Sequence, residues 1–248
     1  MMWRNLCRSI AAVRAPAAVI LILLAGPIAG AQALSVLPVN VFLAPGQRAA
    51  TLSITNQDRN QTAIQIRAYA WDQKDGEDRL TASNEVVVSP PIAVIAAGAT
   101  QIVRLILREE PQRQEATYRI LVDQIPPPAQ PGIVHVVLRL SIPIFAEPAT
   151  PTVPNVQFHL ERDAGQLFLV GINNGLRHDV IRGMVLRTSD GREFKEEPSA
   201  SPYILAGATR RWRMVGKGSL PGPNEVLRLT AQANAGSIEQ PVTVAAAP

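Results

Sequence analysis

Residues 133–145 read Ile-Val-His-Val-Val-Leu-Arg-Leu-Ser-Ile-Pro-Ile-Phe, and every second side chain along one side of this stretch is apolar. The apolar series consists of Val134, Val136, Leu138, Leu140, Ile142 and Ile144. The opposite side carries His135, Arg139, Ser141 and Pro143, with Val137 as its apolar member. This two-residue period predicts a single strand, longer than the usual length of about 5–6 residues. If its own domain leaves part of the apolar side uncovered, the strand offers an edge with which another chain can pair.

The first 33 residues have the features of a secretory signal peptide. Three arginines precede a short apolar core at residues 17–28, and small residues follow at 29–33. We expect cleavage after Ala33, which makes Leu34 the first residue of an exported chain. The alternative is a membrane anchor, but the apolar run is too short to span the hydrocarbon layer comfortably. We therefore expect no stable membrane insertion after the signal is removed.

Charge and cysteine content narrow the function classes. The whole chain has 24 basic and 20 acidic residues, and loss of the three arginines of the leader leaves 21 against 20. This near balance gives no support to a nucleic-acid partner. The only cysteine is Cys7, inside the leader, so the mature chain has neither disulfides nor cysteine metal ligands. The exported protein must be held together by its hydrophobic cores.

Strand patterns dominate the remainder of the chain, and helix patterns are almost absent. Short alternating runs recur at intervals of about ten residues, which is typical of β-sandwiches. The runs are residues 34–43, 48–55, 62–71, 86–88, 101–108, 118–125, 156–160, 167–172, 180–187, 210–215 and 226–232. Three prolines at 148, 151 and 154 mark a stiff connector between two sets of runs. The sequence therefore predicts an all-β protein with a signal peptide at 1–33 and two domains, at 34–149 and 150–248.

A short internal echo suggests that the two domains are related. Ala97-Gly98-Ala99-Thr100 precedes a predicted strand in the first domain, and Ala206-Gly207-Ala208-Thr209 precedes one in the second. The alternative is that both segments are ordinary turns that begin a strand.

Residues 115–127 carry the most specific signal, an acid and an aromatic followed by an apolar strand and a closing Ile-Pro-Pro. This segment resembles the signature of the PapD-like periplasmic pilus-assembly chaperones. Further segments that resemble this family are Ser89-Pro90-Pro91, the Gly98 turn, Val103-Arg104-Leu105, Asn173-Asn174-Gly175 and Tyr203–Trp212. The resemblance extends over the whole mature chain. It implies two immunoglobulin-like β-sandwich domains arranged at an angle. The short connection after Ile125 is similar to that of the short-loop members, those of spore-coat-like or archaic fibres.

The resemblance also implies a function and its site. Such a chaperone binds pilin-like subunits in the periplasm by donor-strand complementation and delivers them to an outer-membrane usher. The donor positions implied here are Val134, Val136, Leu138 and Leu140, whose side chains would fill an open groove in the subunit. No cofactor is implied. The alternative is an exported two-domain immunoglobulin-like binding or adhesion module without chaperone activity, in which the same strand is covered by its own sandwich.

Two positions depart from the family pattern. The family anchors the C-terminal carboxylate of the subunit with an arginine and a lysine, and the matching residues here are the uncharged Asn40 and Pro143. Arg139 and Arg48 are the candidates for a substitute anchor. An interdomain ion pair of the family would fall on Ala96 and Glu147, so we expect this ion pair to be absent and packing to replace it.

No pattern indicates catalysis or metal binding. His135, His159 and His178 are scattered without the ligand spacing of a zinc site. Neither a nucleophile elbow nor a phosphate-binding glycine loop is present, so we expect no enzymatic activity. Arg210-Arg211-Trp212-Arg213 contains a single aromatic residue, which favours a strand with a buried Trp212 and solvated arginines over a nucleic-acid surface.

Overall fold

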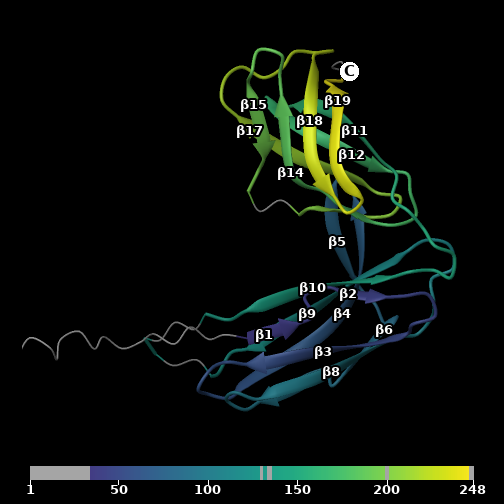
Figure 1. Ribbon diagram of the computed structural model, residues 1–248. Coiled ribbons are helices and arrows are strands. Elements are labelled where there is room, and N and C mark those ends of the chain that lie inside the picture. Colours follow the sequence, from purple (N-terminus) through teal and green to yellow (C-terminus); the bar gives the residue numbers. More distant parts are fainter. Residues whose placement is uncertain (1–33, 129–130, 133–135, 199–200, 246–248) are drawn as a thin grey trace, which may run out of the picture. The chain divides into compact units, whose positions relative to one another are not determined.

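The computed structural model describes residues 34–128, 131–132, 136–198 and 201–245 (Figure 1). These residues form strands joined by turns and loops, which confirms the predicted all-β fold class. The described part of the chain has no helix that could span a membrane. The predicted signal peptide lies outside the described residues.

The first domain is a sandwich of two sheets. The first sheet has the order β1 (Leu34–Leu37), β3 (Ala49–Asn56), β8 (Thr100–Leu107) and β6 (Val86–Ser89). The second has the order β2 (Val41–Leu43), β10 (Arg139–Ala146), β9 (Ala116–Ile125), β4 (Thr62–Lys74) and β5 (Glu77–Ala82), and β7 (Ile92–Ile95) also pairs with β4. Their inner faces enclose a core of aliphatic side chains, among them the fully buried Leu52, Ile64 and Ile120. The predicted alternation of apolar residues is what supplies this inner face.

The first predicted run, residues 34–43, is two strands in two different sheets. β1 pairs with β3, whereas β2 pairs in parallel with the end of β10. Pro38 lies between them and has no N–H with which to continue a ladder. Because of this break the chain passes from one sheet to the other.

The second domain is built from one sheet of seven strands and a two-stranded sheet. The larger sheet has the order β11 (Val156–Asp163), β12 (Gln166–Asn173), β17 (Thr209–Gly216), β15 (Glu193–Glu196), β14 (Arg182–Arg187), β18 (Val226–Ala233) and β19 (Gly236–Thr243). The smaller one consists of β13 (Asp179–Val180) and β16 (Tyr203–Ile204). A bridge between Leu160 and Val244 brings the two ends of the larger sheet together. The enclosed core includes Trp212, which is 1% exposed, as predicted.

The short sequence repeated at residues 97–100 and 206–209 lies in the same hydrogen-bonded arrangement in both domains. At the end of β3, the side-chain amide of Asn56 donates to the carbonyls of Asn60, Ile95 and Ala96. At the end of β12, that of Asn173 donates to the carbonyls of Arg177, Ile204 and Leu205. The backbone N–H groups of the two asparagines bond to Ala99 and Ala208, inside the two repeated turns. These paired networks support a relationship between the two domains.

The strand predicted at 133–145 is shorter in the structure. β10 begins at Arg139, Val136–Leu138 are not in a strand, and Ile133–His135 lie outside the described residues. The neighbouring β9 ends at Ile125, and residues 126–128 are prolines without N–H donors. Val136 and Val137 therefore lack a partner for strand pairing within the described part of the chain.

Candidate strand-pairing edge

The free edge of β10 is the first element of the candidate site. On one side β10 pairs with β9 along its whole length, from Arg139 to Ala146. On the other side β2 pairs only with Ile144–Ala146. Within the described residues, no strand covers this second side between Arg139 and Pro143. The sandwich thus leaves an open edge that ends where β2 begins.

The backbone groups along this edge can be assigned from the register. The N–H of Gln124 donates to the carbonyl of Leu138 at 3.0 Å. Because bonded residues alternate in an antiparallel pair, the even-numbered residues of β10 bond to β9. Arg139, Ser141 and Pro143 consequently direct their backbone groups to the open edge. A proline is tolerated at 143 because its position needs no donor toward β9.

Burial of the predicted donor series decreases toward the beginning of the segment. Ile142 and Ile144 are buried in the core of the first domain, and Leu140 packs against it in part. Leu138 is half-buried, and Val136 is 76% exposed. Val134 lies outside the described residues. The even-numbered side chains thus change along the chain from core residues to exposed apolar residues.

The four predicted anchor positions are widely spread. Asn40 is half-buried next to β2, where its side-chain oxygen accepts a bond from the hydroxyl of Tyr203 at 3.4 Å. Pro143 is buried on β10. Arg48 donates to the backbone carbonyls of Leu107 and Arg108 beside the end of β8. Arg48 is therefore occupied by main-chain bonds away from the open edge.

Arg139 belongs to a ladder of charges across three strands. It forms an ion pair with Asp123, which also pairs with Arg67 at 2.6 Å. Partial burial raises the pKa of Asp123, but the bonds from Arg139 and Arg67 outweigh this effect, and the net pKa lies below its ordinary value. Because one carboxylate is shared by two guanidinium groups, the ladder has an excess positive charge.

Arg119 is a cation that sequence reasoning missed. It lies opposite Pro143 in the register of β9 and β10. Its guanidinium lies over the ring of Trp71, 3.7 Å from the centroid, and 5.2 Å from the ring centroid of Tyr203. The basic residue inside the Tyr118-Arg119-Ile120 strand was the available signal, but only the fold brings Tyr203 to it.

The family's ion pair at Ala96 and Glu147 is absent, as expected, and the junction contains both a packed cluster around Trp71 and Phe145 and other ion pairs. Ala96 is indeed uncharged, but Glu147 pairs with Arg177 at 2.7 Å. Glu115, whose side chain is fully buried, accepts bonds from the backbone N–H and the ring Nδ1 of His178, the latter at 2.6 Å. The ring of His178 also stacks on Phe145 at 3.6 Å. Arg177 and His178, the partners of these carboxylates, belong to the second domain, and the sequence around Ala96 and Glu147 gave no sign of them.

A second set of polar contacts joins β4 and β5 to the second domain. The side chain of Gln73 donates to the carbonyl of Tyr203 at 2.9 Å and accepts from the N–H of Leu205 at 3.0 Å. Asp78 accepts bonds from Trp71, Gln73 and Arg210. Arg210 is therefore buried and paired, whereas the sequence predicted that it would be solvated.

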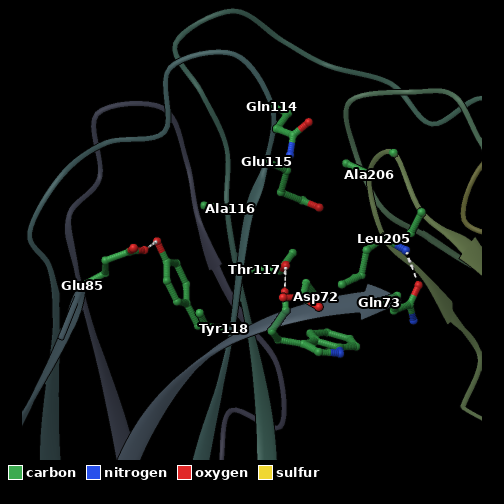
Figure 2. Close-up of a pocket in the computed structure, with 14 residues that line it drawn as sticks. Asp72, Gln73, Glu85, Gln114, Glu115, Ala116, Thr117, Tyr118, Leu205 and Ala206 are labelled. Atoms are coloured by element: carbon green, nitrogen blue, oxygen red, sulfur yellow. Dashed lines mark hydrogen bonds between the residues drawn. The ribbon is translucent and has the colours of Figure 1, made fainter. Parts of the chain in front are cut away.

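A cavity of about 250 Å³ lies beside these contacts, lined by residues of β4, β9 and the turn at 205–208 and by Glu85. Figure 2 shows how the side chains that line it are arranged. The hydroxyl of Tyr118 donates to Glu85 at 2.7 Å, and burial is the main cause that raises the pKa of Tyr118. The hydroxyl of Thr117 donates to the carbonyl of Trp71. Because its lining combines first-domain residues with Leu205–Ala208 of the second domain, the cavity is part of the domain junction. The described residues also contain no group of three or more His, Cys, Asp or Glu side chains that could hold a metal ion.

Comparison with known proteins agrees with this architecture. Residues 33–152 match the family described as pili and flagellar-assembly chaperone, PapD N-terminal domain. No curated protein matches the chain.

Three solved structures illustrate the likeness of fold. One is the CsuC–CsuE chaperone–tip adhesion subunit pre-assembly complex from the archaic chaperone-usher Csu pili of Acinetobacter baumannii, with 20% identity, coverage of 87% of this chain and 100% of that chain, and a TM-score of 0.62. The YadV chaperone has 15% identity, coverage of 85% and 98%, and a TM-score of 0.60. The SafA pilin–SafB chaperone complex of Salmonella enterica has 15% identity, coverage of 86% and 95%, and a TM-score of 0.58. These structures share the fold of this chain, and the match to the PapD N-terminal domain family covers residues 33–152.

Proposed function

We propose that this protein is a periplasmic chaperone that binds pilin-like subunits by donating the segment around β10. Val134, Val136, Leu138 and Leu140 are the donor side chains. The observation that carries the proposal is the open edge of β10 next to an exposed apolar side chain at Val136. The family match and the pilin complexes of proteins with this fold support it.

The proposed binding combines two physical terms. A strand of the subunit pairs with the backbone groups of Arg139, Ser141 and Pro143, and the donor side chains enter a groove of the subunit. Burial of an aliphatic side chain contributes about 1.5–3 kcal/mol, and ordering of the segment offsets part of this gain. A bound subunit would also cover an edge that is open to unwanted pairing with other chains.

The same proposal includes the export of the chaperone and the delivery of its subunit. The leader at residues 1–33 directs the chain to the periplasm and is removed there, and the chaperone hands its subunit to an outer-membrane usher. The protein acts without enzymatic chemistry, since strand addition needs neither a bond rearrangement in the chaperone nor a cofactor.

Two neighbouring valines provide a matched test. Val136→Asp and Val137→Asp each place a carboxylate at an exposed apolar position, 76% and 47% exposed, on opposite sides of the segment. Each variant is co-expressed in a periplasm with the small secreted proteins encoded beside its gene, and complexes are isolated. We expect a one-to-one complex that Val136→Asp abolishes and Val137→Asp retains.

Equal capture by the Val136→Asp variant and the unaltered chain would contradict the assignment of the donor side. A folded protein that captures none of these subunits would favour the exported binding or adhesion module.

A further inference from the structure

A row of alternating charges ends at the open edge of β10. Its members are Arg67 of β4, Asp123 of β9 and Arg139 of β10, and they lie on the outer face of their sheet, because the even-numbered residues of these strands face the core. Asp123 accepts a bond from Arg67 at 2.6 Å and is also paired with Arg139, its direct neighbour in the register. The charges across the three strands of this charge ladder are therefore positive, negative and positive.

Arg139 is the most exposed member of the charge ladder. Its side chain is 64% exposed, against 39% for Arg67 and 15% for Asp123. Its Nε donates to Asp123, whereas its two terminal nitrogens form no hydrogen bond within the described residues. A guanidinium carries most of its N–H donors on these nitrogens, so they remain available to a partner.

The excess positive charge of the ladder is presented mainly at Arg139. Arg67 lies farther from the edge, and its guanidinium carbon is 5.6 Å from the centroid of the Tyr69 ring. Ser141, the next side chain of β10 on the same face, is small and uncharged. A strand added to β10 therefore meets one exposed cation on this face, at the residue where β10 begins.

The sheet geometry determines which part of a partner lies beside Arg139. The backbone groups of Arg139 are directed to the open edge, so an added strand pairs there whether it runs parallel or antiparallel to β10. Cross-strand neighbours on one face have Cβ atoms about 4.5–5.5 Å apart. One side chain of the added strand consequently lies on the outer face within reach of the Arg139 guanidinium.

An acidic side chain at this place would continue the alternation of charges into a fourth strand. Opposite charges on neighbouring strands stabilise the pair, and like charges destabilise it. A carboxylate can also form a bidentate pair with the planar guanidinium. A basic side chain at the same place would meet the excess positive charge, so the charge ladder discriminates both for an acid and against a base.

We infer that Arg139 selects subunits whose pairing strand carries an aspartate or glutamate beside it. This inference rests on the proposed function, because it names a feature of the subunit that the open edge receives. The partner is a side chain within the added strand, at the end of β10 that lies away from the domain junction.

Blocked peptides test this selection on the free protein. The probe is acetyl-TVTETVT-amide, and the controls are the same peptide with Gln or with Lys in place of Glu. Both ends of each peptide are uncharged, so no terminal carboxylate contributes to binding. NMR follows the amide signal of Ser141 and the Nε–H signal of Arg139. We expect the Glu peptide to bind about threefold more tightly than the Gln peptide, and the Lys peptide about threefold more weakly.

Equal affinities of the three peptides, or no response of the Arg139 signal, would overturn the selection. Charge reversal assigns it to one residue. Arg139→Glu is expected to reverse the order of the three affinities, and Arg139→Gln to remove it. Arg104→Glu is the matched control, since Arg104 is an exposed arginine of β8 in the other sheet, and it should leave the order unchanged. A preference for the Glu peptide that persists in Arg139→Glu would overturn the role of Arg139.

Complexes with a captured subunit provide the second test. Arg139→Glu is expected to weaken capture about tenfold relative to Arg104→Glu, because an attractive cross-strand pair becomes a repulsive one. The effect should decrease at high ionic strength, since the pair is exposed. Replacement of the facing acid of the subunit by lysine should restore capture by the Arg139→Glu variant.

The two proposals fail in different ways. Subunit capture that depends on Val136 but is unchanged in Arg139→Glu would remove the selection by charge and leave the chaperone function in place. A preference for the Glu peptide in a protein that captures no subunit would leave an acid-selective edge and remove the chaperone function.

Discussion

Asn56 and Asn173 occupy equivalent places in the two domains, each at the end of a strand and each with its side-chain amide bonded to three backbone carbonyls. Both side chains are almost fully buried. The strand that follows the bonded turn is β8 in the first domain and β17 in the second. In both domains, therefore, a buried asparagine at the end of a strand, β3 or β12, holds the later turn that precedes β8 or β17.

Substitution of either asparagine by alanine is expected to destabilise its own domain. The change leaves three carbonyls without this donor, and each lost bond costs about 1 kcal/mol, for a total of about 2–4 kcal/mol. Urea unfolding of Asn56→Ala and Asn173→Ala measures the loss. The exposed Asn84→Ala is the control and should change the midpoint little. A near-neutral result at both buried sites would show that water replaces the amide.

A glycine in β12 is required by the packing of Trp212. A Cβ atom at Gly171 would lie 2.8 Å from the Trp212 ring and 3.2 Å from Ile204. We expect Gly171→Ala to lower the free energy of unfolding by about 1–3 kcal/mol through overpacking. At Gly222 the nearest atom lies 3.9 Å from the added carbon, so Gly222→Ala is the matched control. Equal thermal midpoints of the two variants would contradict the close fit of Trp212 against β12.

The pair of Asp78 and Arg210 is expected to stabilise the contact between the two domains. Arg210 is 9% exposed, so Asp78→Leu leaves a nearly buried cation without its carboxylate. We expect a loss of about 1–3 kcal/mol, less than the ~3–5 kcal/mol typical of a fully buried pair, because Asp78 is 30% exposed. Adding Arg210→Met should recover part of the loss in a double-mutant cycle. Strictly additive effects would show that the two side chains do not interact.

Acid should weaken the charge ladder at Asp123. The pKa of Asp123 is lowered in the folded protein, because the bonds from Arg139 and Arg67 outweigh the opposite effect of burial. A carboxyl with a lowered folded pKa stabilises the fold above its unfolded pKa and loses this contribution as the pH falls through the folded value. Below about pH 4 we therefore expect the free energy of unfolding to fall. Asp123→Asn should show a smaller fall over the same pH range, and an identical fall would exclude Asp123 as the source.

The sequence was sufficient to predict strands in which apolar and polar residues alternate strictly, and insufficient to predict strands that are exposed. β3, β4, β8 and β12 have one apolar face each and were predicted, whereas β5 is fully exposed and was missed. β19 was missed for the same reason, since only Val242 is buried in it. Such strands are fixed by backbone pairing with their neighbours, which leaves no period in the side chains.

The site was predicted in part for a similar reason. The donor series was visible because alternation is a local property of residues 133–145. The stacking of Arg119 on Trp71 and the pairing of Glu115 with His178 join residues far apart in the chain. Nothing in the local sequence marks these contacts, because the first depends on the pairing of β4 with β9 and the second on how the two domains meet.

The central claim, strand addition at the open edge of β10, is tested most directly by amide hydrogen exchange on the free protein and on its complex with a captured subunit. The register directs the N–H groups of Arg139 and Ser141 to the open edge and that of Ile142 to β9. We predict that exchange at Arg139 and Ser141 slows by at least about tenfold in the complex, while Ile142, already bonded, changes little. Unchanged fast exchange of Ser141 in a stable complex would contradict strand addition at this edge.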